Sequence, residues 1–145
     1  MADLQFTTTL TWEQTGRQGH GTVMLGEKAV DYSAPYSMGG KGEGTSPEEL
    51  LMAAVAACYS GTLFSLLSRE ELPAARVNIS VEGIVTDYPL NGKFATLRVN
   101  PEIVGGDPEQ LSVYQTAAQK ARDRCFIGKT IQGNVKYEVG EVRIS

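Results

Sequence analysis

The chain has very few histidines and cysteines. Its 145 residues include one histidine, His20, and two cysteines. A lone histidine without a second ligand or a paired acid favours a loop side chain over a metal ligand or a member of a serine triad. The Gly42–Gly44 segment lacks the buried strand before it and the lysine after it that a phosphate-binding loop needs. Metal, serine-triad and phosphate-loop sites are therefore not expected, and no bound cofactor is predicted.

Positive charge is also scarce. There are 13 lysines and arginines against 17 aspartates and glutamates, for a net charge of -4, and the basic residues are scattered. Nucleic acid or an anionic membrane surface would require a clustered basic face, so neither is expected as a partner. The first residues, M-A-D-L-Q-F, lack the basic and apolar regions of a secretory signal. We expect a cytoplasmic protein whose thiols are reduced at rest.

Only one long stretch, residues 50–68, carries no charge. Its length reaches the threshold for a membrane helix. However, small residues fill much of it, Glu48 and Glu49 precede it, and Arg69 follows it. This composition favours the central helix of a core that is packed on more than one side. With 41% apolar content, a single domain over residues 1–145 is the expectation.

The remaining elements follow from periodicity and start signals. Ser46 and Glu49 form a capping box, with Pro47 at the first helical position, so the long helix begins there. A second helix is predicted from Asp107, with Cys125 at its end. Alternating apolar residues predict strands at 4–12, 22–25, 28–33, 76–87, 94–104 and 134–144. This order of elements indicates an α+β fold.

The two cysteines, Cys58 and Cys125, each lie at or near the end of an apolar helical run. If they meet in space, one thiol can react with an oxidant and the other can resolve the product as a disulfide, which is the chemistry of a thiol peroxidase. Taken singly, a buried cysteine is more often an inert small apolar side chain. An interpretation of both thiols as core filler therefore stays open.

Five sequence motifs resemble the OsmC/Ohr family of organic hydroperoxide reductases. They are Trp12-Glu13 with Arg17, E-G-T-S-P-E-E-L, A-A-V-A-A-C-Y-S, A-A-Q-K-A-R-D-R-C and G-N-V-K-Y-E-V, which together span residues 8–140. The resemblance implies an intertwined homodimer with long central helices flanked by antiparallel sheets. It also implies a thiol peroxidase that reduces organic hydroperoxides to alcohols and is reset by an external dithiol, with a lipoyl group as the preferred donor.

The resemblance also assigns roles to residues. Cys58 matches the peroxidatic cysteine, Cys125 the resolving cysteine and Glu48 the first carboxylate after the motif proline. Arg17 matches the activating arginine in the first hairpin bend, and Lys41 is a weaker substitute for it. The chain departs from the family after the second cysteine, where Phe126 and Ile127 stand in place of the usual proline, and at Met38, where another branch of the family carries its arginine.

The chemistry demands that Cys58 be kept as a thiolate, because a free thiol has a pKa of about 8.5. Cys58 stands twelve residues past Ser46, too far for the dipole of its own helix to act. A permanently charged arginine can stabilise the thiolate. Glu48 is ten residues, or about 15 Å of helix rise, from Cys58. We therefore expect a composite site at a dimer interface.

Apolar side chains around Cys58 suit an organic peroxide better than hydrogen peroxide. They are Met38, Leu51, Met52, Val55, Leu63 and Phe64. The main alternative to the enzyme is a non-catalytic or redox-sensing OsmC-like protein that binds an apolar ligand at the dimer interface.

Overall fold

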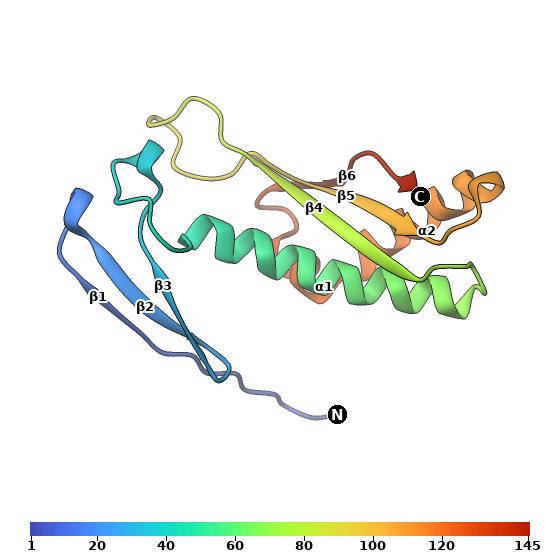
Figure 1. Cartoon of the computed structure of the whole chain (residues 1–145), viewed down its shortest axis with the longest axis horizontal. Helices are drawn as coiled ribbons and strands as arrows, with labels where there is room; N and C mark the ends of the chain where they lie inside the picture. The colour runs from blue at the N-terminus through green and yellow to red at the C-terminus, as the bar shows by residue number, and fades with distance from the viewer. The chain divides into compact units, whose positions relative to one another are not determined.

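The computed structural model describes residues 1–145, and its residue contacts form two compact units, Met1–Leu51 and Met52–Ser145. Helix α1 (Pro47–Arg69) runs across the boundary between them (Figure 1). The single domain that we expect over residues 1–145 remains a prediction, because the contacts form two units and a continuous helix joins them.

The first unit contains a three-stranded antiparallel sheet in the order β1 (Leu10–Glu13), β2 (His20–Leu25), β3 (Lys28–Tyr32). All three strands were predicted, although β1 begins at Leu10 rather than at residue 4. Two short 3-10 helices, η1 (Gly16–Gln18) and η2 (Tyr36–Met38), follow β1 and β3.

The second unit has a mixed sheet. Strands β4 (Arg76–Ile84) and β5 (Thr96–Val104) pair antiparallel over nine residues each. Strands β6 (Lys136–Val139) and β7 (Arg143–Ile144) both pair with β5 in parallel, so the prediction of antiparallel sheets is right for the first unit and for β4 with β5, and wrong for β6 and β7.

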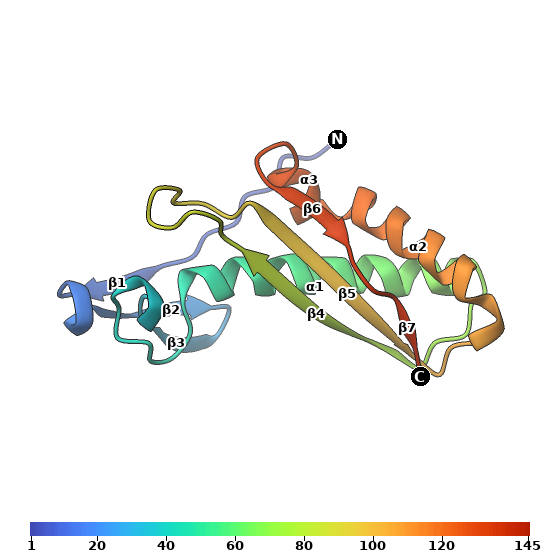
Figure 2. The same ribbon diagram turned by 90° about the horizontal axis from the view of Figure 1, so that it is seen from above.

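The reason for the parallel pairing is the connection between β5 and β6. The chain passes through η3 (Pro108–Gln110), α2 (Leu111–Arg124) and α3 (Phe126–Ile131) before it returns as β6 (Figure 2). A helical crossover of this kind brings the next strand back in the same direction.

The start of α1 is the predicted one. The Glu49 N–H donates to the Ser46 hydroxyl oxygen (3.2 Å), and that hydroxyl donates to the Glu49 carboxylate (3.1 Å). Pro47 occupies the first helical position, where its missing N–H costs nothing. By length and composition alone α1 could cross a membrane, but the central helix of a folded core meets the same criteria.

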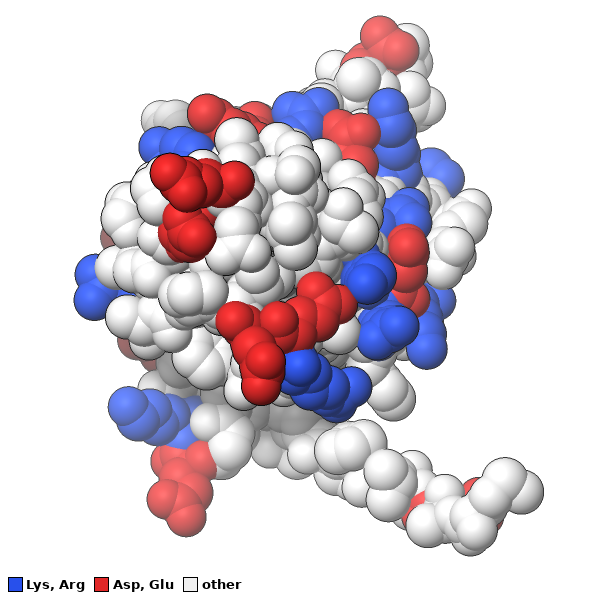
Figure 3. All heavy atoms as spheres, turned by 90° about the vertical axis from the view of Figure 1, so that its right-hand side faces the viewer, with Lys and Arg blue, Asp and Glu red and all other residues white.

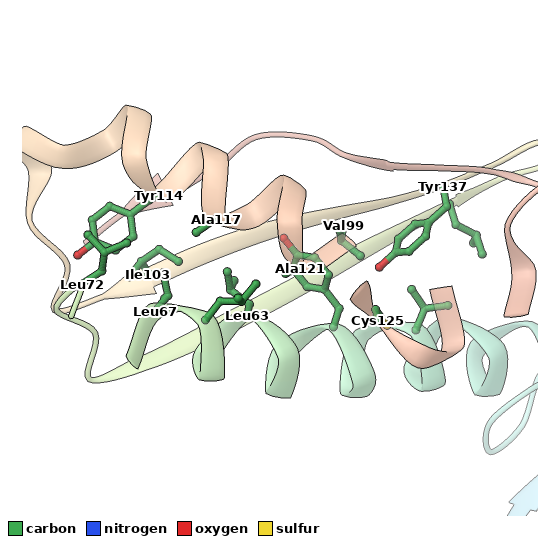
Figure 4. Close-up of a cluster of buried hydrophobic side chains, with 14 residues drawn as sticks. Leu63, Leu67, Leu72, Val99, Ile103, Tyr114, Ala117, Ala121, Cys125 and Tyr137 are labelled. Atoms are coloured by element: carbon green, nitrogen blue, oxygen red, sulfur yellow. The ribbon is translucent and has the colours of Figure 1, made fainter. Parts of the chain in front are cut away.

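One hydrophobic core fills the second unit. Leu97, Val99 and Ile103 alternate along β5 and are fully buried against α1 and α2 (Figure 4). Helix α1 contributes Val55, Tyr59, Leu63, Leu66 and Leu67, and α2 contributes Tyr114, Ala117, Ala118 and Ala121. Cys125 and Tyr137 close this core at one end, so one of the two candidate redox thiols lies inside it.

Charged side chains are of mixed sign on the face in Figure 3, where acidic and basic groups are interspersed. On the second sheet Arg98 pairs with Glu82 (3.6 Å) and with Glu138 (2.8 Å), and Arg143 pairs with Glu102 (3.7 Å). These pairs neutralise charge locally on the second sheet.

Candidate active site

Cys58 and Cys125 come together in the second unit. Cys58 is half-buried in the middle of α1, whereas Cys125 is fully buried between α2 and α3. Both are free thiols, and each contributes to the pKa shift of the other, so the two side chains are neighbours. Neighbouring thiols are what a redox pair requires.

Cys125 interrupts the helix that was predicted to reach it. Its backbone is extended (φ -61°, ψ 126°), so it ends α2 and at the same time precedes the first turn of α3. Its N–H donates to the Ala121 carbonyl (3.0 Å), and its sulfur accepts the Gly128 N–H (3.4 Å). Cys125 thus caps α3 with its thiol, a role usually filled by serine, threonine, aspartate or asparagine.

Helix α3 supplies donors that the sequence argument did not foresee. The N–H groups at the start of a helix have no partner within it, and those of Phe126 and Ile127 act on the Cys58 thiol to lower its pKa. The sequence argument considered only the start of α1, which is too far from Cys58, and did not foresee that a further helix, α3, begins directly after Cys125. The sequence feature that could have indicated these N–H groups is the absence of proline after Cys125, since a proline at position 126 would have no N–H to offer.

The two thiols have opposite pKa shifts. Burial acts to raise the pKa of Cys58, but hydrogen bonds from the Ile127 N–H, the Cys125 thiol, the Phe126 N–H and Thr62 outweigh it, and the pKa is lowered. Burial, and then the neighbouring Cys58 sulfur, raise the pKa of Cys125. Cys58 is therefore the thiol of the pair that ionises more readily, and Cys125 is the one that keeps its proton.

Two tyrosines border the pair, although the sequence suggested only packing roles for tyrosines. Burial, followed by the charge of Cys125, raises the pKa of both Tyr59 and Tyr137, so their hydroxyls stay protonated. The Tyr59 hydroxyl donates to the Ala118 carbonyl (3.0 Å). The Tyr137 hydroxyl is buried and makes no hydrogen bond.

The other two predicted site residues, Arg17 and Glu48, belong to the first unit. Arg17 lies in η1, and its Nη1 donates to the Gly40 carbonyl (2.9 Å) and to the Tyr36 carbonyl (3.4 Å). Its guanidinium also stacks on the Tyr36 ring at 3.7 Å from the ring centre. Arg17 thus anchors the glycine-rich loop from residue 37 to residue 44 within its own unit. Glu48 lies in the first turn of α1.

Lys41, the weaker substitute for Arg17, pairs with Glu43 at 3.7 Å. Met38 is largely exposed in the same loop. Val55 and Leu63, which we expected near a substrate, are fully buried in the core and are therefore ruled out as a peroxide-binding wall, whereas Leu51 and Phe64 remain exposed. No group of three or more potential metal-ligating side chains is present.

Comparison with known proteins gives a consistent result. The family model described as OsmC-like protein matches residues 40–140. An uncharacterized protein, YmaD of Bacillus subtilis, is 31% identical over 144 residues, covering 96% of this chain and 94% of that protein. An organic hydroperoxide resistance protein of Xanthomonas axonopodis pv. citri is 29% identical over 124 residues, 83% of each chain.

Among solved structures, an organic hydroperoxide resistance protein OsmC from Legionella pneumophila superposes with a TM-score of 0.74 at 25% identity. The match covers 97% of this chain and 99% of that one. The agreement extends over both compact units, since it includes almost the whole chain.

Proposed function

The chain belongs to the OsmC-like protein family, and on this premise we propose that it is a thiol peroxidase that reduces organic hydroperoxides to alcohols. The observation that carries the proposal is the pair of neighbouring thiols Cys58 and Cys125, in which the more accessible thiol has the lowered pKa. A thiolate is the nucleophile in peroxide reduction. A similar protein from Xanthomonas axonopodis pv. citri carries the name organic hydroperoxide resistance protein.

The proposed cycle begins with attack of the Cys58 thiolate on the terminal peroxide oxygen. The O–O bond breaks, Cys58 becomes a sulfenic acid, and the alkoxide takes up a proton and leaves as an alcohol. Cys125 then attacks the Cys58 sulfur, and the hydroxyl group leaves with the Cys125 proton as water. The resulting disulfide is reduced by an external dithiol, for which a lipoyl group is the proposed source.

For Arg17 and Glu48 we propose a role across a dimer interface, with the guanidinium beside the Cys58 thiolate and Glu48 orienting it. The contacts of Arg17 with carbonyl oxygens use Nη1, which leaves other guanidinium nitrogens to bind a thiolate. Support for a homodimer comes from α1, since only 28% of its most apolar 18-residue stretch is buried. Leu51 and Phe64 are exposed on this helix, and a second copy would cover them.

The dimer proposal is tested by sedimentation of the wild type and of Phe64→Glu. A charge at a buried contact position is costly. The variant should therefore sediment as a monomer, or its dimer should dissociate at protein concentrations at which the wild type is still a dimer. A wild type that is monomeric at all concentrations would remove the composite site.

The enzyme proposal is tested by turnover with cumene hydroperoxide and a dithiol donor. Wild type should consume many equivalents of peroxide, Cys58→Ser should consume none, and Cys125→Ser should form a sulfenic acid that becomes overoxidised. Ser60→Ala, which changes a half-buried side chain on the same helix, serves as the matched control. Equal turnover by wild type and Cys58→Ser would refute the proposal.

A second candidate, a redox sensor, is favoured by one observation. The groups that lower the Cys58 pKa are uncharged donors of its own unit, and a reactive thiolate of this kind can signal without turnover. A sensor would react with one equivalent of peroxide and then stop, even when a dithiol is supplied. Sustained consumption of peroxide would exclude it.

A further inference from the structure

The Tyr137 hydroxyl is a buried polar group that makes no hydrogen bond in this structure. Only 3% of Tyr137 is exposed, so bulk solvent does not reach the hydroxyl. A phenylalanine would fill the same space without leaving a polar atom unpaired. Buried hydroxyls without a partner are rare in folded proteins, and each one calls for an explanation.

The surrounding structure fixes the ring in this position. Tyr137 lies on β6 opposite Leu97 of β5, and its carbonyl accepts a hydrogen bond from Arg122 Nε (2.8 Å). The ring packs against Gly128 so closely that a Cβ on this glycine would lie 2.5 Å from Tyr137 Cε2. Any larger residue at position 128 would therefore push the ring away.

The hydroxyl is directed at Cys125. Figure 4 shows the Tyr137 ring with its oxygen pointing toward the Cys125 side chain at the end of the core. Gly128, which makes room for the ring, also donates its N–H to the Cys125 sulfur (3.4 Å). The Gly128 N–H thus binds this sulfur, and the Tyr137 hydroxyl faces it without a hydrogen bond of its own. A neutral thiol is a weak acceptor, whereas an ionised acceptor makes much stronger hydrogen bonds.

We propose that the Tyr137 hydroxyl is a hydrogen-bond donor to Cys125 that stabilises this sulfur as a thiolate during disulfide formation and reduction. The inference deepens the proposed function and rests on it. In the resolving step the Cys125 S–H bond breaks, the sulfur–sulfur bond forms, and the Cys58 S–O bond breaks. The proton leaves with the hydroxyl group as water, so Tyr137 keeps its own proton throughout and acts by hydrogen bonding alone.

The first test separates oxidation from resolution in Tyr137→Phe. After one equivalent of cumene hydroperoxide, a sulfenic acid trap and mass spectrometry follow each species with time. We expect Cys58 oxidation at the wild-type rate and disulfide formation slower by a factor of about 10 to 100, the range for a lost hydrogen bond to a charged group. Overoxidation of Cys58 should increase. Disulfide formation at the wild-type rate would overturn the inference.

Tyr114→Phe is the matched control. It also removes a buried hydroxyl, but one that is bonded to the Pro73 carbonyl and to the Asp107 N–H, and it is expected to leave disulfide formation unchanged. Slowing of the same size in this control would mean a general structural effect and would also overturn the inference. Tyr137→Phe keeps the ring and is expected to unfold at a temperature equal to or above that of the wild type.

A second test needs no peroxide, so it separates failure of the inference from failure of the proposed function. In Cys58→Ser, Cys125 is the only thiol, and its ionisation is followed by thiolate absorbance. Tyr59, the other titratable group that acts on Cys125, is unchanged and stays bonded to the Ala118 carbonyl. Adding Tyr137→Phe should move the Cys125 midpoint to higher pH, and an identical midpoint would refute the role of Tyr137 even if the protein is a peroxidase.

Discussion

The N–H of Phe126 is a donor to the Cys58 sulfur that a single substitution can delete. Phe126→Pro removes it without disturbing the fold, because position 126 is the first residue of α3, where proline is well tolerated. The preceding residue, Cys125, already has the extended backbone that proline prefers before it (φ -61°, ψ 126°). The variant thus subtracts one hydrogen bond from the thiolate and leaves the Ile127 donor in place.

The size of the effect follows from the strength of that bond. A hydrogen bond to a charged group contributes about 1.5–3 kcal/mol, and the lower end applies because Cys58 is only half-buried and water partly replaces the donor. Each 1.36 kcal/mol corresponds to about a tenfold change in an equilibrium. At a pH below the midpoint, the thiolate fraction and the rate of alkylation should therefore fall about tenfold.

The assay is the pH dependence of alkylation of Cys58 by iodoacetamide. The Phe126→Pro curve should move to higher pH, while Phe126→Ala, which keeps the N–H and loses a side chain that is 68% exposed, should coincide with the wild type. Coincidence of the proline variant with the wild type would show that the start of α3 does not activate Cys58. A shift in the alanine variant alone would assign the effect to the ring.

Three further predictions concern pH, the core and the activating cation. Because the folded-state pKa of Cys58 is lowered, its thiolate stabilises the fold above the unfolded-state pKa, and this stabilisation is lost as pH falls through the folded-state pKa. The free energies of unfolding of wild type and Cys58→Ser in urea should therefore differ above that pH range and converge below it. A difference that stays constant with pH would contradict the shift. Leu63→Ala removes most of a fully buried side chain of α1, leaves a cavity and should lower the free energy of unfolding by about 2–5 kcal/mol in urea titrations, whereas a loss below 1 kcal/mol would mean that Leu63 is not in the core. Arg17→Ala should slow oxidation of Cys58 by hydroperoxide about tenfold or more in stopped-flow experiments, and a normal rate in this variant with a slow rate in Lys41→Ala would move the role to Lys41.

Local signals predicted the elements that depend on neighbouring residues. The start of α1 follows from the side chains of Ser46 and Glu49, which are three positions apart, and β4 and β5 follow from alternation in the sequence. The two cysteines were identified by their motifs. Their hydrogen bond depends on how α2 and α3 pack on α1, which no short segment of sequence encodes.

What could not be predicted is mostly nonlocal or lacks a marker residue. Parallel pairing of β6 with β5 depends on the path of the crossover, and no glycine or proline marks the break between α2 and α3, which occurs at Cys125 itself. The sequence argument ended a helix at Cys125 and predicted none after it, and therefore overlooked the start of α3. Tyr137 was overlooked because its neighbours Gly128 and Arg122 come from other elements of the fold.

The central claim is that Cys58 is a reactive thiolate poised to form a disulfide with Cys125. The most direct measurement is the intact mass and free-thiol count of reduced protein after one equivalent of cumene hydroperoxide. The account predicts loss of two hydrogen atoms, no free thiols and one peptide pair that links Cys58 to Cys125. Unchanged mass with both thiols still titratable would contradict it.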